Sequence, residues 1–246
     1  MKIVVIGGTG LIGSKVVAQL KGQGHEAVAA SPNTGVNTVT GEGLVDALTG
    51  AQVLVDVSNS PSFEERAVLD FFTTSTTNLV AAARATNVRH YVALSVVGTQ
   101  RLSASPYFRA KIAQENLIKG AGIAYTIVHA TQFFEFMKSI ADAATVEGVV
   151  HLSHALIQPM AADDVAAAVV RFALGDPVNG TVEIAGPEQF GLDEFVQKGL
   201  RITHDPREVV SDPEAPYFGV LLEERMLVPA NGAETSSTRF EQWATR

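Results

Sequence analysis

The chain of 246 residues contains no cysteine, so disulfide bonds, thiolate metal sites and a cysteine nucleophile are excluded. Clusters of Lys and Arg are also missing, and 26 acidic against 18 basic residues give a net charge of −8. Proteins that bind a phosphate backbone need such basic clusters. We therefore expect neither nucleic acid nor an anionic membrane as a partner.

Long apolar runs are missing as well, although hydrophobic residues make up 46% of the chain. The first apolar run, Ile3 to Ile6, ends at Gly7, far short of a signal-peptide core or a membrane span. A cytoplasmic location is the resulting expectation. The composition is otherwise typical of a well-packed globular protein.

A glycine-rich turn is present between an expected strand at 2–6 and an expected helix at 11–23. Its sequence, GGTGLIG, fits both G-x-G-x-x-G and G-x-x-G-x-x-G. Glycines permit positive φ and close approach to a pyrophosphate, and the helix N-terminus offers free N–H groups. The turn predicts a bound dinucleotide. The residues expected to contact it are Gly7, Thr9, Gly10, Leu11, Ile12 and Gly13.

Strand and helix patterns alternate along the first half of the chain. Further strands are expected at 25–30, 36–40, 51–57, 89–96 and 123–128, and helices at 43–48, 64–87 and 107–119. This alternation predicts an α/β fold, a doubly wound parallel (Rossmann) sheet, in a single domain over residues 1–246.

The pattern changes after His129, where aromatic residues crowd together and prolines become frequent. We expect a small, discontinuous C-terminal lobe there, from about 133–160 and 187–230, that covers the substrate. A helix at 163–174 and a strand at 181–185 are expected to return to the main sheet.

The segment after the second strand has no acidic residue between Glu26 and Glu42. NAD sites usually place Asp or Glu there for the ribose 2′-hydroxyl, so a 2′-phosphate would meet no like charge. NADP is therefore favoured, with NAD as the alternative. Because no Lys or Arg lies between 22 and 65, the phosphate contacts are assigned to Ser31, Asn33, Thr34 and backbone amides; the competing interpretation is a turn that contacts nothing.

Tyr107 and Lys111 lie four residues apart at the start of an expected helix, where such side chains share a face. A neighbouring ammonium lowers the pKa of a phenol from about 10, as general acid–base catalysis requires. Ser95 ends the preceding strand, at the sheet edge where α/β proteins bind ligands. The three residues together predict a catalytic site.

These motifs, in this order, resemble the short-chain dehydrogenase/reductase superfamily over nearly the whole chain. The glycine spacing and the segments HYVALSVVG, HATQFFEF, QPMAADDVAAAV and EIAGPEQF are similar to its atypical NmrA-like, NAD(P)-binding branch. The resemblance implies hydride transfer from nicotinamide to a carbonyl or imine carbon of a small or medium substrate. It implies that Tyr107 donates the proton, Ser95 polarises the carbonyl, and Lys111 lowers the Tyr107 pKa and binds the nicotinamide ribose.

Two further segments follow strands of the expected sheet. Ser58 and Asn59 either line the adenosine side of the cofactor or cap their own loop. By the resemblance, Thr131 and Phe133 lie near the nicotinamide amide. The aromatic cluster just beyond Phe133 is either an apolar substrate wall or core.

The sequence departs from the family at Phe72, near the position where many active members have a catalytic Asn; Asn78 lies close by. The alternative function is an NAD(P)-sensing regulatory protein without turnover, as in some NmrA-type relatives. Those relatives tend to lose the tyrosine, so Tyr107 favours the enzyme. No metal site is expected, because His151 and His154 have no third ligand at a matching spacing. The oligomeric state is left open.

Overall fold

The computed structural model describes residues 1–245 and divides the chain into two compact units. The first unit comprises residues 1–95, 106–129 and 165–182. The second comprises residues 96–105 and 130–164 and continues from Glu183 to the C-terminal end.

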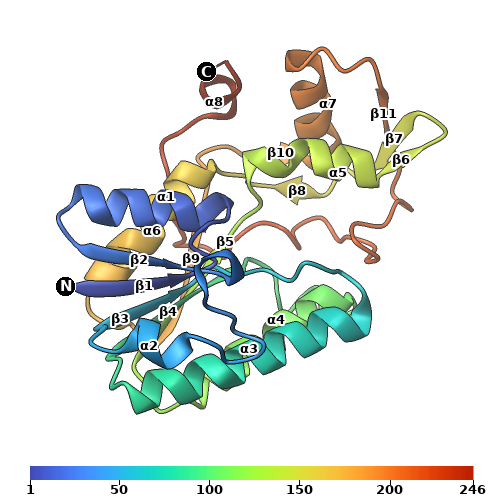
Figure 1. Ribbon diagram of the computed structural model, residues 1–246. Helices are drawn as coiled ribbons and strands as arrows, with labels where there is room; N and C mark the ends of the chain where they lie inside the picture. The colour runs from blue at the N-terminus through green and yellow to red at the C-terminus, as the bar shows by residue number, and fades with distance from the viewer. Residues whose placement is uncertain (246) are drawn as a thin grey trace. The chain divides into compact units, whose positions relative to one another are not determined.

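The central sheet has seven strands in the order β12-β9-β5-β4-β3-β1-β2, and the expected α/β, doubly wound parallel fold is confirmed (Figure 1). Its strands are β1 (Lys2–Ile6), β2 (Glu26–Ala30), β3 (Val53–Asp56), β4 (His90–Val96), β5 (Tyr125–Ala130), β9 (Gly180–Ala185) and β12 (Glu234–Thr235). β1 pairs in parallel with β2 and β3, and β4 pairs in parallel with β3. Every residue of β3 is buried, as expected for a sheet covered on both faces.

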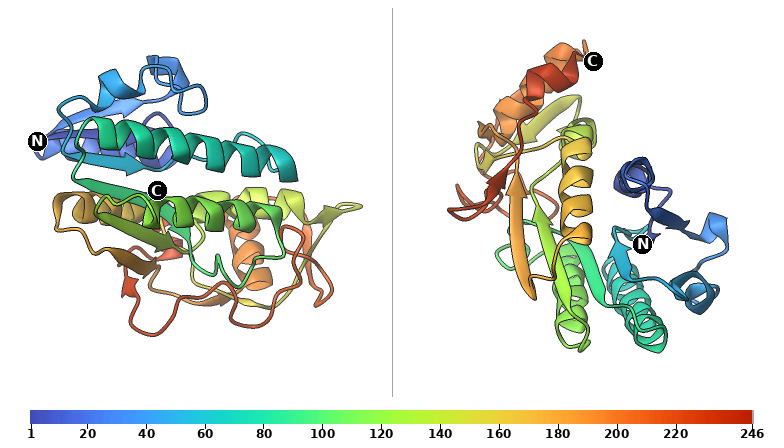
Figure 2. Two further views of the ribbon diagram at one scale, coloured as in Figure 1. Left: turned by 90° about the horizontal axis from the view of Figure 1, so that it is seen from below. Right: turned by 90° about the vertical axis from the view of Figure 1, so that its left-hand side faces the viewer.

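Helices cover both faces of the sheet in the first unit (Figure 1). On one face lie α1 (Leu11–Gly22) and α6 (Ala162–Leu174), and on the other lie α2 (Leu44–Leu48), α3 (Glu65–Ala85) and α4 (Pro106–Lys119). The two long helices α3 and α4 run side by side, as Figure 2 also shows. The side of α4 that faces inward is unusually polar, since it buries Lys111, Gln114 and Glu115.

The strand expected at 36–40 is wrong. The chain after β2 forms a short 3-10 helix, η1 (Pro32–Thr34), and then turns. The Asn37 side chain accepts hydrogen bonds from two backbone amides just after it, and the Asn78 amide donates to Thr38 O and Val39 O at 2.8 and 3.0 Å. Side chains thus make the hydrogen bonds to these backbone groups that a neighbouring strand would make in a sheet. The other expected elements end within two residues of the observed ones.

The second unit contains both segments expected to form the lobe, 133–160 and 187–230. Its helices are η2 (Phe134–Phe136), α5 (Met137–Ala143), α7 (Leu192–Ile202) and α8 (Phe240–Ala244). One small sheet joins β6 (Thr145–Val146), β7 (Val149–Leu152) and β11 (Glu208–Ser211), and another joins β8 (Leu156–Ile157) and β10 (Phe190–Gly191). Packed aromatic rings form much of this unit's core: Phe134, Phe195, Phe240 and Trp243.

Candidate active site

The glycine turn joins β1 to α1 through backbone contacts that only glycine allows. Gly7 has φ +74°, and the N–H groups of Gly7 and Gly8 both donate to Ala30 O, at 2.9 and 3.3 Å. A Cβ on Gly13 would lie 2.1 Å from Gly7 O. The close packing of α1 against the turn therefore requires glycine at position 13.

The N-terminus of α1 suits an anionic cofactor. Gly10, at the N-cap, provides no side-chain cap, and no acidic residue lies in the first turn. The first N–H groups of a helix have no intrahelical acceptor, and the helix dipole adds partial positive charge at this end. Thr9, Gly10 and Leu11 are exposed at this end, whereas Ile12 and Gly13 are buried. The pyrophosphate of NAD(P) fits this arrangement.

The residues expected to hold a 2′-phosphate differ in their availability. Ser31 is 7% exposed, and its hydroxyl has no hydrogen-bond partner within residues 1–245. The Thr34 hydroxyl already accepts from Ser31 N at 2.9 Å and donates to Ala29 O of β2 at 3.0 Å. Asn33 is exposed. Ser31 and Asn33 thus remain available to a ligand, and Thr34 shapes the loop.

Ser58 and Asn59 follow β3 and pass beside the glycine turn. A Cβ on Gly7 would lie 3.0 Å from the Cα of Ser58. The Ser58 amide and hydroxyl both donate to Asp56 Oδ1, at 3.1 and 2.6 Å, and Asn59 is exposed. Ser58 therefore caps its own loop and also lies next to the expected cofactor turn.

Lys111 is only 2% exposed, and its ammonium group is bound inside the protein. Nζ donates to Leu94 O at 3.0 Å and to Gln114 Oε1, and lies 4.6 Å from the centre of the Phe72 ring. The Phe72 ring thus covers the ammonium. Burial lowers the pKa of Lys111 to about 8, although two nearby carboxylates act in the opposite direction.

Gln114 connects Lys111 to a buried carboxylate at the end of β3. Its Nε2 donates to Asp56 Oδ2 at 3.0 Å, and the Tyr91 hydroxyl donates to the same oxygen at 2.9 Å. These bonds replace the hydration that Asp56 loses on burial. Asp56 and Gln114 were not among the expected site residues. An acid at the end of the apolar strand VLVD was the available signal.

The Lys111 ammonium does not lower the pKa of Tyr107, although the spacing of the two residues suggests that it would. Its ring packs against Phe63 and Phe72, with centroids 5.6 and 6.0 Å apart, and burial raises the pKa of Tyr107 to about 12. The expected lowering of this pKa is wrong, because the ammonium is directed to Leu94 O, Gln114 and the Phe72 ring. The Tyr107 hydroxyl makes no hydrogen bond within residues 1–245.

Ser95 is 4% exposed, and its hydroxyl donates to Glu115 Oε1 at 2.7 Å. Glu115 also accepts from His129 Nε2 at 2.8 Å and from Lys119 Nζ at 3.2 Å. Burial opposes its charge, but the bonds from His129 and Ser95 and the charge of Lys119 outweigh it and lower the pKa of Glu115 to about 2. The Ser95 proton is directed to Glu115, and its expected donation to a carbonyl oxygen stays a prediction.

Thr131 and Phe133 belong to the second unit. The Thr131 hydroxyl donates to Gln158 O at 2.7 Å, and the Phe133 ring stacks on that of Phe136 with centroids 5.2 Å apart. Between them, Gln132 is buried, and neither of its amide atoms has a partner within the described residues. The expected contacts of Thr131 and Phe133 with nicotinamide stay predictions.

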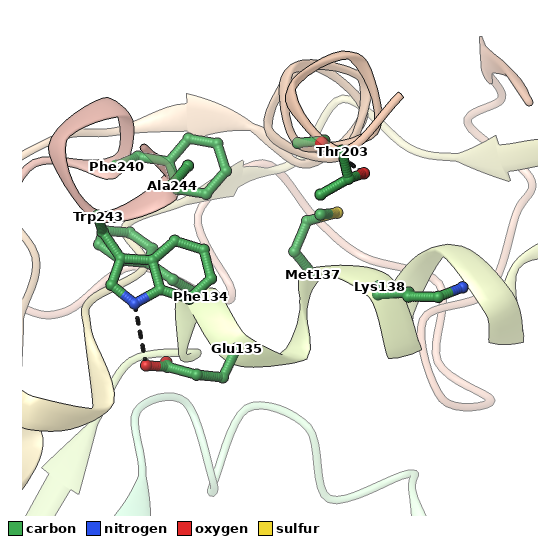
Figure 3. Close-up of a pocket in the computed structure, with 9 residues that line it drawn as sticks. Phe134, Glu135, Met137, Lys138, Thr203, Phe240, Trp243 and Ala244 are labelled. Carbon is green, nitrogen blue, oxygen red and sulfur yellow. Dashed lines mark hydrogen bonds between the residues drawn. The ribbon is translucent and has the colours of Figure 1, made fainter. Parts of the chain in front are cut away.

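The aromatic cluster after Phe133 is mainly core. Phe134 and Met137 are buried, whereas Phe136 is 43% exposed. This unit contains a pocket of about 230 Å³. Trp243 Nε1 donates to Glu135 at 3.2 Å in the lining of this pocket (Figure 3). None of the expected cofactor-binding or catalytic residues lines this pocket.

Within residues 1–245, no three His, Cys, Asp or Glu side chains gather in a way that could hold a metal ion. His151 and His154 contact separate carboxylates, those of Asp212 and Asp193, at 3.4 and 2.8 Å. The described helices include none with the length and hydropathy needed to span a bilayer.

Comparison with protein families gives a match over residues 7–176 to the family described as NAD(P)H-binding. This match covers more than half of the chain and includes the glycine turn, Ser95, Tyr107 and Lys111. The chain belongs to the NAD(P)H-binding family. Its free helix N-terminus at α1 agrees with a bound NAD(P) pyrophosphate.

Curated relatives of this NAD(P)H-binding protein include photosystem II assembly factors. Ycf39 of Cyanophora paradoxa is 28% identical over 149 residues, which cover 55% of this chain and 46% of Ycf39. Ycf39 of Synechocystis is 24% identical over 236 residues, which cover 87% of this chain and 72% of that protein. The match to the first of these relatives spans less than half of its length.

Solved structures with low sequence identity share the fold. MoeE5 in complex with UDP-glucose and NAD aligns with a TM-score of 0.75 at 18% identity, covering 100% of this chain and 97% of that one. A dTDP-4-dehydrorhamnose reductase from Clostridium acetobutylicum aligns with a TM-score of 0.73 at 17% identity, covering 100% and 98%. At these identities the similarity shows a common fold.

Proposed function

We propose that this NAD(P)H-binding protein is an NADP-preferring oxidoreductase of the atypical NmrA-like branch of the short-chain dehydrogenase/reductases. Its proposed substrate is a small or medium carbonyl compound, and Tyr107 is the proton donor. One observation carries the proposal. Among residues 1–245 the Tyr107 hydroxyl has no hydrogen-bond partner, whereas the Ser95 hydroxyl and the Lys111 ammonium are both bound within the protein.

Tyr107 carries the proton that a carbonyl reduction needs. When bound, the reduced cofactor supplies a hydride to the carbonyl carbon, and the carbonyl oxygen must then take up a proton. With a pKa of about 12, the Tyr107 phenol carries its proton throughout the neutral range and can donate it. The phenolate that would accept a proton from an alcohol is scarce there, so the resting protein is set up for reduction.

The preference for NADP is supported by the loop after β2. The buried Ser31 hydroxyl has no partner in the described part of the chain, Asn33 is exposed, and no carboxylate between Glu26 and Glu42 would repel a 2′-phosphate. An unpaired buried hydroxyl is costly, and a phosphate oxygen would accept its hydrogen bond. These groups support NADPH as the physiological reductant.

The test is NADPH consumption against a panel of aldehydes and ketones by the wild type and Tyr107→Phe. We expect Tyr107→Phe to retain NADPH affinity and to lose about 100-fold or more in kcat, the typical contribution of a general acid. Tyr125→Phe, which removes a phenol from β5, is the matched control and should keep wild-type turnover. Full turnover by Tyr107→Phe would disprove the acid assignment.

A second candidate function is an NAD(P)H-sensing protein without turnover that acts on a protein partner. It is favoured by the internal bonds that occupy the Ser95 hydroxyl and the Lys111 ammonium, and by relatives named photosystem II assembly factors. Wild-type protein that binds NADPH but oxidises it with no compound of the panel would support this second function.

A further inference from the structure

The pocket in the second unit has aromatic walls that pack against one another. Phe134, Phe240 and Trp243 line it, and the centroids of their rings lie 5.1 to 5.9 Å apart in all three pairs. Figure 3 shows the three rings grouped together. Met137, which is also buried, adds a thioether to the lining. A cavity of about 150 Å³ can hold benzene, so this pocket of about 230 Å³ has room for a somewhat larger apolar body.

Glu135 places a half-buried carboxylate beside these rings without a cationic partner. Its Oε1 accepts from Trp243 Nε1 and from Ala162 N, both at 3.2 Å, and its Oε2 accepts from Ala162 N at 3.1 Å. Both donors are neutral, and no Lys, Arg or His pairs with Glu135 within residues 1–245. Because a carboxylate has about four acceptor sites, Glu135 can accept a further hydrogen bond.

The other polar side chains that line the pocket are already engaged. Lys138 Nζ lies 3.3 and 3.4 Å from the two carboxylate oxygens of Asp142. The Thr203 hydroxyl donates to a backbone carbonyl of α7 at 3.0 Å. The N–H of Trp243 is the only donor of its side chain and is used by Glu135. Glu135 is therefore the polar group available to a ligand, and the ligand must supply the donor.

We infer that this pocket binds an organic ammonium ion with a small apolar body. The body lies against Phe134, Phe240 and Trp243, and the ammonium group donates to Glu135. Aromatic faces attract cations as the carboxylate does, and the net charge of −8 favours a positively charged ligand. Every residue of the lining belongs to the second unit, and none is an expected cofactor-binding or catalytic residue. The inference therefore does not depend on the proposed reductase activity.

The test measures the binding of 3-phenylpropylammonium through Trp243, the only tryptophan of the chain. The indole lines the pocket, so its fluorescence should change on binding, and calorimetric titration gives an independent affinity. The matched ligands 3-phenylpropan-1-ol and 3-phenylpropanoate carry a neutral and a negative group on the same frame. A hydrogen bond between charged groups contributes more than a neutral one. The ammonium should therefore bind about tenfold more tightly than the alcohol, and the carboxylate should bind most weakly.

Glu135→Gln tests the charge of the carboxylate. The amide keeps an oxygen that can accept from Ala162 N and Trp243 Nε1. We expect the affinity for the ammonium to fall about tenfold, to that of the alcohol, while the affinity for the alcohol stays unchanged. A merely structural loss would weaken both ligands. Glu208→Gln removes an exposed carboxylate of β11 outside the pocket and is the control that should keep the wild-type affinities.

Gly199→Ala tests whether the ligands occupy this pocket. The new Cβ would lie 2.5 Å from Met137 Cε, so the flexible thioether must move, and both residues line the pocket. The displaced side chain takes up pocket volume, so the variant should lose affinity for the ammonium and the alcohol alike. Gly22→Ala, where nothing lies within 4 Å of the new Cβ, is the control. Thermal unfolding checks that each variant folds.

Four outcomes overturn this inference. They are no binding of the ammonium by fluorescence or calorimetry, equal affinity for the ammonium and the alcohol, tighter binding of the carboxylate, and unchanged affinities in Gly199→Ala. Each of them leaves NADPH oxidation and the Tyr107→Phe result untouched. Ammonium binding that requires Glu135 in a protein that never oxidises NADPH would remove only the proposed reductase activity.

Discussion

Single polar residues on the inner face of α4 hold the groups on which the proposed chemistry depends. Lys111 is bound by Leu94 O and Gln114, and Ser95 is bound by Glu115. Buried charges need such partners, because the protein interior solvates them poorly. The role of each candidate residue is consequently set by the neighbour that it contacts as well as by its own chemistry.

Glu115 should make the stability of the protein depend on acid pH. Its pKa is about 2 in the folded protein against an ordinary 4.5, so its ionised form stabilises the fold above pH 4.5. That contribution, on the order of 3 kcal/mol, is lost as the pH falls from 4.5 toward 2. Urea unfolding across this range should show a smaller loss of stability for Glu115→Gln than for the wild type. The exposed Glu26→Gln is the control and should follow the wild type.

Gln114 should contribute to the stability of the fold chiefly by binding the charged Lys111 side chain. Gln114→Leu removes an acceptor from the buried ammonium, and the loss of a hydrogen bond to a charged group costs about 1.5–3 kcal/mol in the free energy of unfolding. Adding Lys111→Met removes the unpaired charge and should restore part of that loss. A double-mutant cycle by chemical denaturation measures the coupling. Additive effects of the two changes would contradict the arrangement described here.

At the scale of elements, the junction of β1 and α1 is the most constrained part of the first unit. Its geometry depends on glycines whose hydrogens leave space for neighbouring backbone. The segment 36–40, after β2, shows the opposite case, because Asn37 and Asn78 hold it in a turn although its residues favour a strand. The local sequence pattern predicts the structure correctly where backbone geometry determines it. The prediction fails where the side chain of a distant residue holds the segment in another conformation.

Gly13→Ala should separate α1 from the glycine turn. The new Cβ would lie 2.1 Å from Gly7 O, so the helix must shift. Overpacking of this kind costs about 1–3 kcal/mol, and the displaced helix N-terminus should bind NADPH at least tenfold more weakly. Gly22→Ala is the matched control: nothing lies within 4 Å of its Cβ position, so stability and affinity should be preserved. NADPH fluorescence titration and thermal unfolding measure both. Wild-type affinity in Gly13→Ala would contradict the pyrophosphate assignment.

At the scale of the whole molecule, cofactor binding should stabilise the folded chain against unfolding. A ligand that binds only the native state raises its stability by RT ln(1 + [L]/Kd), so the tighter cofactor produces the larger rise in Tm. We expect NADPH to raise Tm more than NADH at equal concentration. Ser31→Ala should reduce the shift with NADPH more than the shift with NADH. Equal shifts with the two cofactors would remove the preference inferred from the loop after β2.

The sequence by itself determined the α/β class, the place of nearly every element in the first unit and the glycine turn, because periodicity and backbone φ are local properties. It also indicated Ser95, Tyr107 and Lys111. Only the tertiary structure decided how those groups are used. Gln114 binds the Lys111 ammonium, Glu115 accepts the hydrogen bond of the Ser95 hydroxyl, and burial raises the Tyr107 pKa to about 12. Hydrogen-bond direction and desolvation depend on residues brought together from different elements, which no single stretch of sequence contains.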